Sequence, residues 1–274
     1  MLTQELLIRS VKTAALTDSR VEAALMYGSF TQGEGDEYSD IEFYLYLRDP
    51  EDFDLRAWLE ANVAPVLLLH TNQFGTPNAI FGGLIRGEFH VEPLEAMQNV
   101  LDWPGRDVNV DAMLVKDETG ELRAILETLR ERGKKRPPPE AEIQVRIDQL
   151  LNAFVFGSGV LLRGERMRAL DHLSWIQRHL MHLARLAEES RNRLTPQRAL
   201  EREITPHTYA RLEATVRPLP ELEQGYAEAW RLAQDLLEIL RERHDLDARE
   251  AVTAQLGARF RGQAGQPDGD RRWA

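Results

Sequence analysis

Two acidic residues separated by one apolar residue open a strand-like segment near the amino end of the chain. Asp40 and Glu42 flank Ile41, and the run Ile41–Leu47 is rich in residues that favour strands. Alternate residues of a strand point to the same side, so the two carboxylates are predicted to lie together while Ile41 and Phe43 face a core. Neighbouring carboxylates repel each other unless a cation lies between them. Oxygen ligands of this kind suit magnesium, which takes few carboxylates together with water and substrate phosphates.

A glycine and a serine precede this acidic pair and suggest a site for phosphate. Gly28 and Ser29 follow the apolar run Val21–Tyr27, and ten residues separate Ser29 from Asp40. Glycine allows a phosphate to approach the backbone closely, and a serine hydroxyl beside amide groups at the start of a helix adds a donor. The sequence therefore predicts that Gly28 and Ser29 hold the outer phosphates of a nucleotide next to the metal site.

A third carboxylate is expected from a later strand. In the segment Leu84–Glu92, alternation places Glu88 on one face together with Arg86, His90 and Glu92. If this strand neighbours the first acidic strand, Glu88 reaches the same cleft as a metal ligand, as a general base for an acceptor hydroxyl, or as both. Glu92 shares the face and is the alternative candidate. Two magnesium ions, roughly 3.5–4 Å apart, would hold a triphosphate and activate the attacking hydroxyl.

Each of these features has a structural explanation when it is taken alone. A glycine-serine turn is common, and two carboxylates that alternate on a strand more often form a solvated face. The combined order of strand, Gly28-Ser29, spacer, Asp40 and Glu42 favours the catalytic interpretation.

Composition restricts the classes of partner. The chain of 274 residues has 34 basic and 45 acidic residues, and its net charge of -11 disfavours nucleic acid and anionic membranes as partners. The absence of cysteine excludes disulfides, thiolate zinc sites and a thiol nucleophile. Neither a signal peptide nor a stretch approaching the length of a membrane span is expected, so the prediction is a cytoplasmic protein.

The residues before and after a proline-rich run differ in their predicted secondary structure. Arg132–Glu140 combines basic residues with three prolines, which interrupt regular hydrogen bonding. Before it, strand-like runs alternate with helical patterns, which predicts an α+β domain with a mixed sheet flanked by helices. The predicted strands are Val21–Tyr27, Ile41–Leu47, Val63–Leu69 and Leu84–Val91.

Helical periodicity dominates after that run. Long helices are expected up to about Glu189 and from Pro220 to Glu242, packed as an antiparallel bundle. The predicted domains are therefore a catalytic domain at 1–132, a linker at 133–139, a helical bundle at 140–258 and a disordered, glycine-rich tail at 259–274.

The catalytic pattern resembles a known superfamily. Gly28-Ser29 followed by Ser39–Glu42 is similar to the active-site motif of the polymerase-β-like nucleotidyltransferases. More narrowly, the chain up to about Asp245 resembles the lincosamide nucleotidyltransferases of the B type, outside the divergent stretches Asp49–Ala61 and Pro93–Asp111. The segments that carry this likeness are Met26–Thr31, Gly33–Asp36, Tyr38–Tyr44, Leu84–His90, Asp117–Glu121 and Val160–Glu165.

The resemblance implies a fold, an activity and an assembly. Members of this family are similar in having an N-terminal catalytic domain and a C-terminal helical bundle that helps to enclose the substrates, and they tend to form homodimers. They attach a nucleoside monophosphate to a hydroxyl of lincomycin or clindamycin. On this likeness Asp40 and Glu42 would bind magnesium, and Glu88 would complete the site as the base.

Three functional hypotheses follow. The first is transfer of a nucleoside monophosphate from a nucleoside triphosphate to a hydroxyl of a small molecule, with a lincosamide as the leading acceptor and an aminoglycoside as the next. The second uses the same machinery on a protein or transfer RNA in a toxin-like or regulatory system. The third is a nucleotide-binding module without catalysis, which the presence of all three carboxylates gives no reason to prefer.

Several further side chains have both a functional and a structural interpretation. Tyr44 and Tyr46 could stack on a base or line an acceptor pocket, although packing is the favoured role. His90 could orient a carboxylate or contact substrate, although a structural role is favoured. The other candidates lie in the helical segment: Arg163, Arg166 and His172, either on a solvated face or bound to the triphosphate, and Trp175 and Trp230, in the bundle core or a dimer interface.

Overall fold

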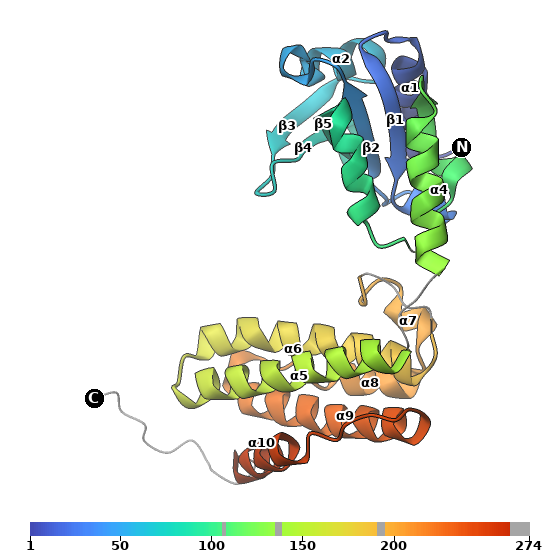
Figure 1. Ribbon diagram of the computed structural model, residues 1–274. Coiled ribbons are helices and arrows are strands. Elements are labelled where there is room, and N and C mark those ends of the chain that lie inside the picture. The colour runs from blue at the N-terminus through green and yellow to red at the C-terminus, as the bar shows by residue number, and fades with distance from the viewer. Residues whose placement is uncertain (106–107, 135–138, 191–194, 264–274) are drawn as a thin grey trace. The chain divides into compact units, whose positions relative to one another are not determined.

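The chain consists of two compact units. The computed structural model describes residues 1–105, 108–134, 139–190 and 195–263. The first unit, Met1–Arg136, holds all the predicted catalytic residues, and the second is Pro137–Ala274 (Figure 1). Below they are called the catalytic unit and the helical unit.

The catalytic unit is built on a mixed six-stranded sheet. Its strand order is β3-β4-β5-β2-β1-β6, in which β2 and β5 pair in parallel and the other neighbours pair antiparallel. The α+β class with a mixed sheet is thus confirmed. The strands are β1 (Val21–Tyr27), β2 (Ile41–Leu47), β3 (Val66–Thr71), β4 (Pro77–Phe81), β5 (Arg86–Pro93) and β6 (Leu114–Asp117).

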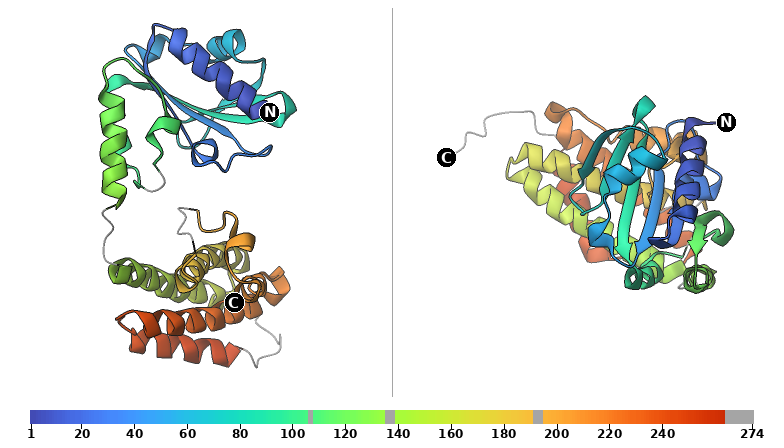
Figure 2. Two further views of the ribbon diagram at one scale, coloured as in Figure 1. Left: turned by 90° about the vertical axis from the view of Figure 1, so that its right-hand side faces the viewer. Right: turned by 90° about the horizontal axis from the view of Figure 1, so that it is seen from above.

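Helices cover both faces of this sheet (Figures 1 and 2). The face that carries Ile41 and Phe43 packs against α1 (Thr3–Thr17) and α2 (Leu55–Asn62). The opposite face, with Tyr44 and Tyr46, packs against the second set. This second set comprises the 3-10 segment η4 (Leu94–Asp102) and the helices α3 (Val110–Met113) and α4 (Glu121–Lys134). Alternate residues of β2 therefore enter two separate cores, as the strand period requires.

The strand predictions succeeded where the apolar alternation was strongest. β1 and β2 have the predicted bounds, whereas β3 begins at Val66 instead of Val63 and β5 at Arg86 instead of Leu84. Val63 still belongs to the end of α2, because its amide donates to the Leu59 carbonyl. The sequence prediction missed β4 and β6, since β4 starts with a proline and β6 has only four residues.

The helical unit packs around a continuous apolar core. Leu173, Leu180, Ala229 and Leu236 are fully or almost fully buried in it, and the Tyr226 hydroxyl donates to the Ala169 carbonyl at 2.8 Å. The helices are α5 (Pro139–Leu162), α6 (Arg166–Ala187), α7 (Leu200–Glu203), α8 (Pro206–Glu213), α9 (Leu222–Arg243) and α10 (Glu250–Gln263). The predicted long helices correspond to α6 and α9.

The two tryptophans singled out from the sequence have different environments. Trp230 is buried in the core of the helical unit, as one of the two interpretations expected. Trp175 is 53% exposed, so of the two interpretations the bundle core does not apply to it, and a dimer interface stays a prediction. Helical spacing indicates which residues lie on the same side of a helix, but not how much of the helix surface is buried.

Helix α5 corrects the expectation that no segment approaches a membrane span. By length and composition alone, the stretch Glu140–Leu162 is long and apolar enough to cross a membrane. Half of its most apolar window is buried, and Ile147 and Phe154 lie fully inside the core of the helical unit. A core helix passes the same test, so this helix is weak evidence for a membrane span.

The carboxyl-terminal helix extends further than the sequence indicated. Residues 259–263, which were predicted to start a disordered tail, belong to α10 because Phe260 is buried against Phe154 and Trp230, with ring centroids 5.7 and 5.8 Å away. At the linker, α4 extends to Lys134 and α5 begins at Pro139. The rest of the predicted tail (264–274) and the centre of the linker (135–138) lie outside the described residues.

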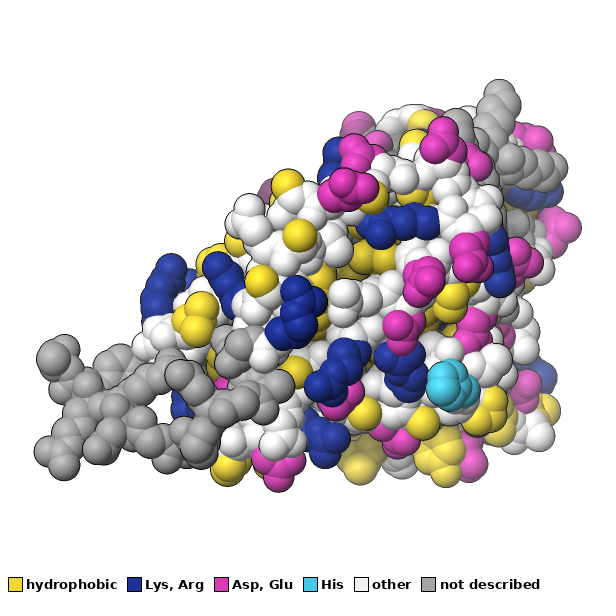
Figure 3. All heavy atoms as spheres, turned by 90° about the horizontal axis from the view of Figure 1, so that it is seen from below, with side chains coloured by type: hydrophobic (Ala, Val, Ile, Leu, Met, Phe, Trp, Pro, Cys, Tyr) yellow, Lys and Arg dark blue, Asp and Glu magenta, His cyan; other side chains and the backbone are white. Residues whose placement is uncertain are grey.

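The negative charge of the chain is concentrated in the catalytic unit. Residues 1–136 contain 24 acidic and 14 basic side chains, whereas residues 137–274 contain 21 acidic side chains and 20 arginines. Basic and acidic groups are interspersed on the face of the helical unit in Figure 3. An anionic substrate of the catalytic unit therefore needs a local source of positive charge.

Phe260→Ala tests the docking of α10. We expect the substitution to lower the free energy of unfolding of the protein by about 3–5 kcal/mol, because it leaves a cavity between Phe154 and Trp230. Urea titration followed by circular dichroism measures this change. Phe156→Ala is the matched control, since Phe156 is 45% exposed on α5 and its loss should cost much less. Equal effects of the two substitutions would contradict a docked α10.

Candidate active site

The turn after β1 brings the backbone of Gly28 against the side chain of Glu42. Gly28 has φ +81°, a conformation that L side chains rarely adopt. A Cβ atom built on Gly28 would lie only 1.5 Å from Glu42 Oε2. Both the backbone conformation and the Glu42 carboxylate therefore exclude any larger residue at this position.

The segment between Gly28 and Asp40 is held by its own hydrogen bonds. Ser29 is buried and begins a 3-10 helix of four residues, η1 (Ser29–Gln32), rather than a long α-helix. The Thr31 hydroxyl donates to the Gly28 carbonyl at 2.7 Å. Near the end of the segment, the Asp36 carboxylate accepts from the Ser39 hydroxyl at 2.8 Å, directly before Asp40. These contacts fix the path of the chain into β2.

Strand pairing brings two of the predicted carboxylates level with each other. Glu42 on β2 lies opposite Tyr27 on β1 and opposite Glu88 on β5, and Asn78 on β4 lies opposite Glu88. Residues paired in this way share a face of the sheet. The two strands that carry Glu42 and Glu88 are therefore neighbours, as the choice of Glu88 required. Glu92 lies opposite Tyr46, further along β2.

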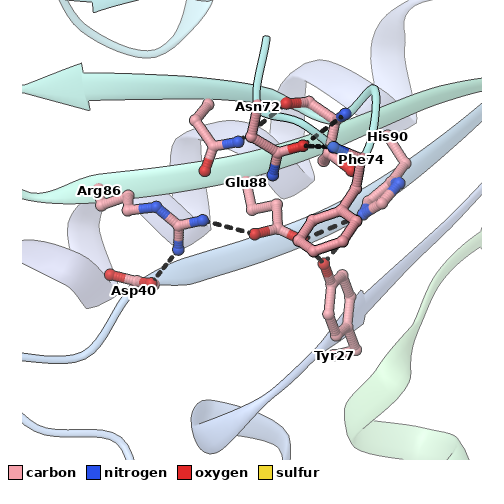
Figure 4. A network of polar contacts seen from close by, with 9 residues as sticks. Tyr27, Asp40, Asn72, Phe74, Arg86, Glu88 and His90 are labelled. Atoms are coloured by element: carbon pink, nitrogen blue, oxygen red, sulfur yellow. Dashed lines mark hydrogen bonds and ion pairs between the residues drawn. The ribbon is translucent and has the colours of Figure 1, made fainter. Parts of the chain in front are cut away.

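A single arginine joins Asp40 to Glu88 (Figure 4). One terminal nitrogen of Arg86 donates to the Asp40 carboxylate, and the other donates to Glu88 Oε2 at 2.6 Å. The second Glu88 oxygen accepts from the Tyr27 hydroxyl at 2.8 Å and lies 3.3 Å from His90 Nε2. Both oxygens of Glu88 are thus engaged, and this carboxylate is the centre of the network.

These contacts change how the network ionises. Burial alone would raise the pKa of Glu88, but hydrogen bonds from Tyr27, Arg86 and His90 outweigh it and hold this pKa below its usual range. Burial lowers the pKa of His90, although the neighbouring Glu88 partly opposes the shift. Burial, and then the Glu88 carboxylate, raises the pKa of Tyr27. At neutral pH the network therefore combines an ionised Glu88 with an uncharged His90 and Tyr27.

Aromatic side chains form one side of the network. The Tyr44 ring stacks on His90 with centroids 3.8 Å apart, and Trp103 lies 5.3 Å from Tyr44. Burial raises the pKa of Tyr44 to about 12, and Tyr46 is fully buried in the core. Tyr46 packs as the sequence favoured. His90 lies against the Glu88 carboxylate, the contact required by the interpretation that it orients a carboxylate.

The basic candidates of the helical unit are held within that unit. Arg166 donates to Glu223 at 2.6 Å and to the Leu219 carbonyl at 2.5 Å. Arg163 lies 3.7 Å from Glu165, and His172 Nε2 lies 3.0 Å from the Ala153 carbonyl. Each of the three has a partner within the helical unit, and a contact with the triphosphate stays a prediction.

The ligand chemistry of the site fits magnesium. Among the described residues, no group of three or more His, Asp or Glu side chains is already arranged to hold a metal ion. However, Asp40 and Glu88 are both within reach of one cationic group, the guanidinium of Arg86, and Glu42 is level with Glu88. Carboxylates that already accept positive charge from Arg86, with a further carboxylate on the paired strand, are oxygen ligands of the kind that magnesium prefers.

The helical unit provides the decisive comparison with known proteins. Residues 140–259 match the family described as "Lincosamide nucleotidyltransferase-like, C-terminal domain". The match covers less than half of the chain and relates the helical unit to that family. The match confirms the relationship inferred from the sequence, and the enzyme class is nucleotidyltransferase.

Two solved structures resemble the whole chain at low sequence identity. An aminoglycoside 6-adenyltransferase from Bacillus subtilis has 12% identity and a TM-score of 0.44, over 96% of this chain and 97% of that one. A nucleotidyltransferase-like protein from Exiguobacterium sibiricum 255-15 has 15% identity and a TM-score of 0.39, over 93% of this chain and 89% of that one. Likenesses this weak assign no function by themselves. No curated protein matches the sequence significantly.

Two residues that contact Glu88 received no role from the sequence. Tyr27 immediately precedes Gly28, and its hydroxyl is the nearest donor to Glu88 Oε1. Arg86 was placed on the correct face by alternation, but its contact with Asp40 depends on the pairing of β2 and β5. Both contacts follow from the strand order β5-β2-β1, which local alternation does not give.

Gly28→Ala tests the contact between the turn and Glu42. We expect it to abolish nucleotidyl transfer, because the new methyl group displaces the Glu42 carboxylate. Steady-state kinetics and urea unfolding measure activity and stability. Gly33→Ala is the matched control, since Gly33 has φ +72° but nothing lies within 4 Å of an added Cβ, so only the backbone cost of about 1 kcal/mol should remain. Similar kinetic defects in both variants would contradict the proposed contact.

The depressed pKa of Glu88 predicts a pH dependence of stability. Its stabilising contribution should be complete above the usual glutamate pKa of 4.5 and should decrease as the pH falls through the lower pKa of the folded state. The difference in unfolding free energy between the wild type and Glu88→Gln should therefore shrink below pH 4.5. Urea titrations from pH 7 to pH 3 measure it. A difference that stays constant over this range would contradict the assignment.

Proposed function

We propose that the protein catalyses the magnesium-dependent transfer of a nucleoside monophosphate from a nucleoside triphosphate to a hydroxyl of a small molecule. The observation that carries this proposal is that Asp40, Glu42 and Glu88 lie on or directly before the paired strands β2 and β5. Glu42 lies against Gly28 and level with Glu88, while Arg86 links Glu88 to Asp40. The nucleotidyltransferase relationship of the helical unit supports the same reaction type.

The reaction forms one bond and breaks another at the α-phosphorus. The acceptor oxygen bonds to this phosphorus, the bond to the bridging oxygen of the leaving group breaks, and pyrophosphate departs. Glu88 is the proposed acceptor of the hydroxyl proton, because its carboxylate is ionised and has a fixed orientation. Tyr27 and His90 orient Glu88, and Gly28 with Ser29 receives the outer phosphates.

Asp40 and Glu42 are the proposed main ligands of magnesium, with Glu88 as the third carboxylate. Two bound ions would neutralise the triphosphate and polarise the phosphorus, as in other two-metal sites. The catalytic unit has 24 acidic and 14 basic side chains, so this neutralisation is needed before a triphosphate can bind there.

A lincosamide is the proposed acceptor, on the strength of the family of the helical unit. An aminoglycoside is the next candidate, followed by a protein or transfer RNA target. The negative charge of the chain disfavours the RNA but not a protein target. A homodimer and a cytoplasmic location remain part of the proposal.

A transfer assay tests the activity directly. The protein is incubated with magnesium, each of the four nucleoside triphosphates and either lincomycin, clindamycin or a panel of aminoglycosides, and the drugs are analysed by mass spectrometry. We expect a mass increase of one nucleoside monophosphate and an equal yield of pyrophosphate. If no small acceptor gains this mass while labelled nucleotide enters macromolecules of a lysate, the second hypothesis is favoured.

Substitution of the carboxylates tests their roles. Asp40→Asn, Glu42→Gln and Glu88→Gln should each lower kcat by about 100-fold or more, the usual scale for loss of a charged group that acts in the transition state. Glu92→Gln, on the same face of β5, should retain near wild-type activity. Retention of turnover by Asp40→Asn would refute the metal assignment.

A further inference from the structure

Arg86 has two acidic partners, and both belong to the proposed metal site. Its guanidinium donates to Asp40 through one terminal nitrogen and to Glu88 through the other. Its side chain is 36% exposed, as is that of Asp40, whereas that of Glu88 is 22% exposed. Arg86 therefore lies at the open edge of the site, with the more enclosed carboxylate behind it.

The guanidinium and a divalent cation require the same oxygens. An arginine that engages two carboxylates satisfies their lone pairs and cancels part of their repulsion. A magnesium ion needs lone pairs of the same carboxylates and adds a second positive charge next to the first. Full engagement of Asp40 and Glu88 by both cations at once is therefore disfavoured, and binding of one opposes binding of the other.

We propose that Arg86 is a positioning residue that holds Asp40 and Glu88 until a divalent cation displaces it, and that it then binds the triphosphate. This inference rests on the proposed function, because it assigns a sequence of contacts to the same site. In the first state Arg86 keeps the carboxylates in place without a metal ion. In the second state it supplies positive charge to an anionic substrate.

The chemistry of arginine suits both states. Its planar fork binds carboxylates and phosphates with the same geometry, so one side chain serves either partner. Arg86 lies two residues from Glu88 on the same face of β5, and rotation of its side chain requires no change in the pairing of β2 with β5. The exposed position of the side chain leaves it free to turn.

The first half of the proposal is tested by metal binding without nucleotide. Free Mn²⁺ is measured by electron paramagnetic resonance during titration of the wild type, Arg86→Gln and Arg86→Lys. We expect Arg86→Gln to bind Mn²⁺ about tenfold more tightly, the ratio that corresponds to one competing charged hydrogen bond. Arg86→Lys should lie between them, because an ammonium keeps the charge but not the fork.

Arg48→Gln is the matched control for charge. Arg48 follows the opposite end of β2, pairs with Glu22 and is largely exposed, so this variant loses one positive charge outside the site. Its Mn²⁺ affinity should equal that of the wild type. An unchanged or weaker affinity in Arg86→Gln, or an equal gain in both variants, would overturn the proposal. If circular dichroism shows that Arg86→Gln is unfolded, Arg86→Lys is the test variant. A Mn²⁺ affinity of Arg86→Lys equal to that of the wild type then overturns the proposal.

The second half is tested by nucleotide binding at saturating Mn²⁺. Calorimetry with a non-hydrolysable triphosphate should show weaker binding to Arg86→Gln than to the wild type, again by about tenfold, and no change in Arg48→Gln. Equal nucleotide affinities would refute this half. If the wild type transfers nucleotide but the Mn²⁺ affinity of Arg86→Gln is unchanged, only the Arg86 inference fails. If the wild type neither binds Mn²⁺ with nucleotide nor forms product, the proposed function fails.

Discussion

Electrostatic repulsion between carboxylates on two paired strands is the constraint on which the site depends. Glu42 and Glu88 are level across the parallel β2–β5 pair, and Asp40 lies immediately before β2. Such a cluster is unfavourable without positive charge. In the structure Arg86 provides that charge to Asp40 and Glu88, while Tyr27 donates a further hydrogen bond to Glu88. The same repulsion would favour binding of the divalent cation that we propose, so one cause would underlie both the stability of the site and its chemistry.

The surrounding fold keeps the cluster in place. The opposite sides of β2 and β5 are anchored by Phe43 and Phe89, which are fully buried with ring centroids 6.0 Å apart. Gly28 ends β1 next to Glu42, and the hydrogen-bonded segment from Ser29 to Ser39 returns the chain to Asp40. The apolar core thus fixes the strand register, and the register fixes which polar side chains meet. Loss of packing on the apolar face of β2 and β5 would displace the carboxylates on the opposite face.

The sequence predicted the parts of this arrangement that depend on local pattern. Alternation in β1 and β2 gave their bounds, and it placed Asp40, Glu42 and Glu88 on the correct faces. It could not give the bridge by Arg86 or the donor Tyr27, because these contacts cross between strands that are far apart in sequence. In the helical unit, periodicity located α6 and α9 but not the extension of α10, which depends on the tertiary contacts of Phe260. Periodicity likewise could not decide between the bundle core and an interface for Trp175, since burial depends on neighbours that periodicity does not identify.

The location of a bound divalent ion tests the central claim most directly. Crystals of the full chain grown with Mn²⁺ and a non-hydrolysable triphosphate would reveal the ion by its anomalous scattering. We expect a peak between Asp40 and Glu42, with Mn²⁺ about 2.0–2.2 Å from their oxygens, near the magnesium distances, and with the phosphates beside Gly28. A peak coordinated by other side chains, with Asp40 and Glu42 turned toward solvent, would contradict the proposed site.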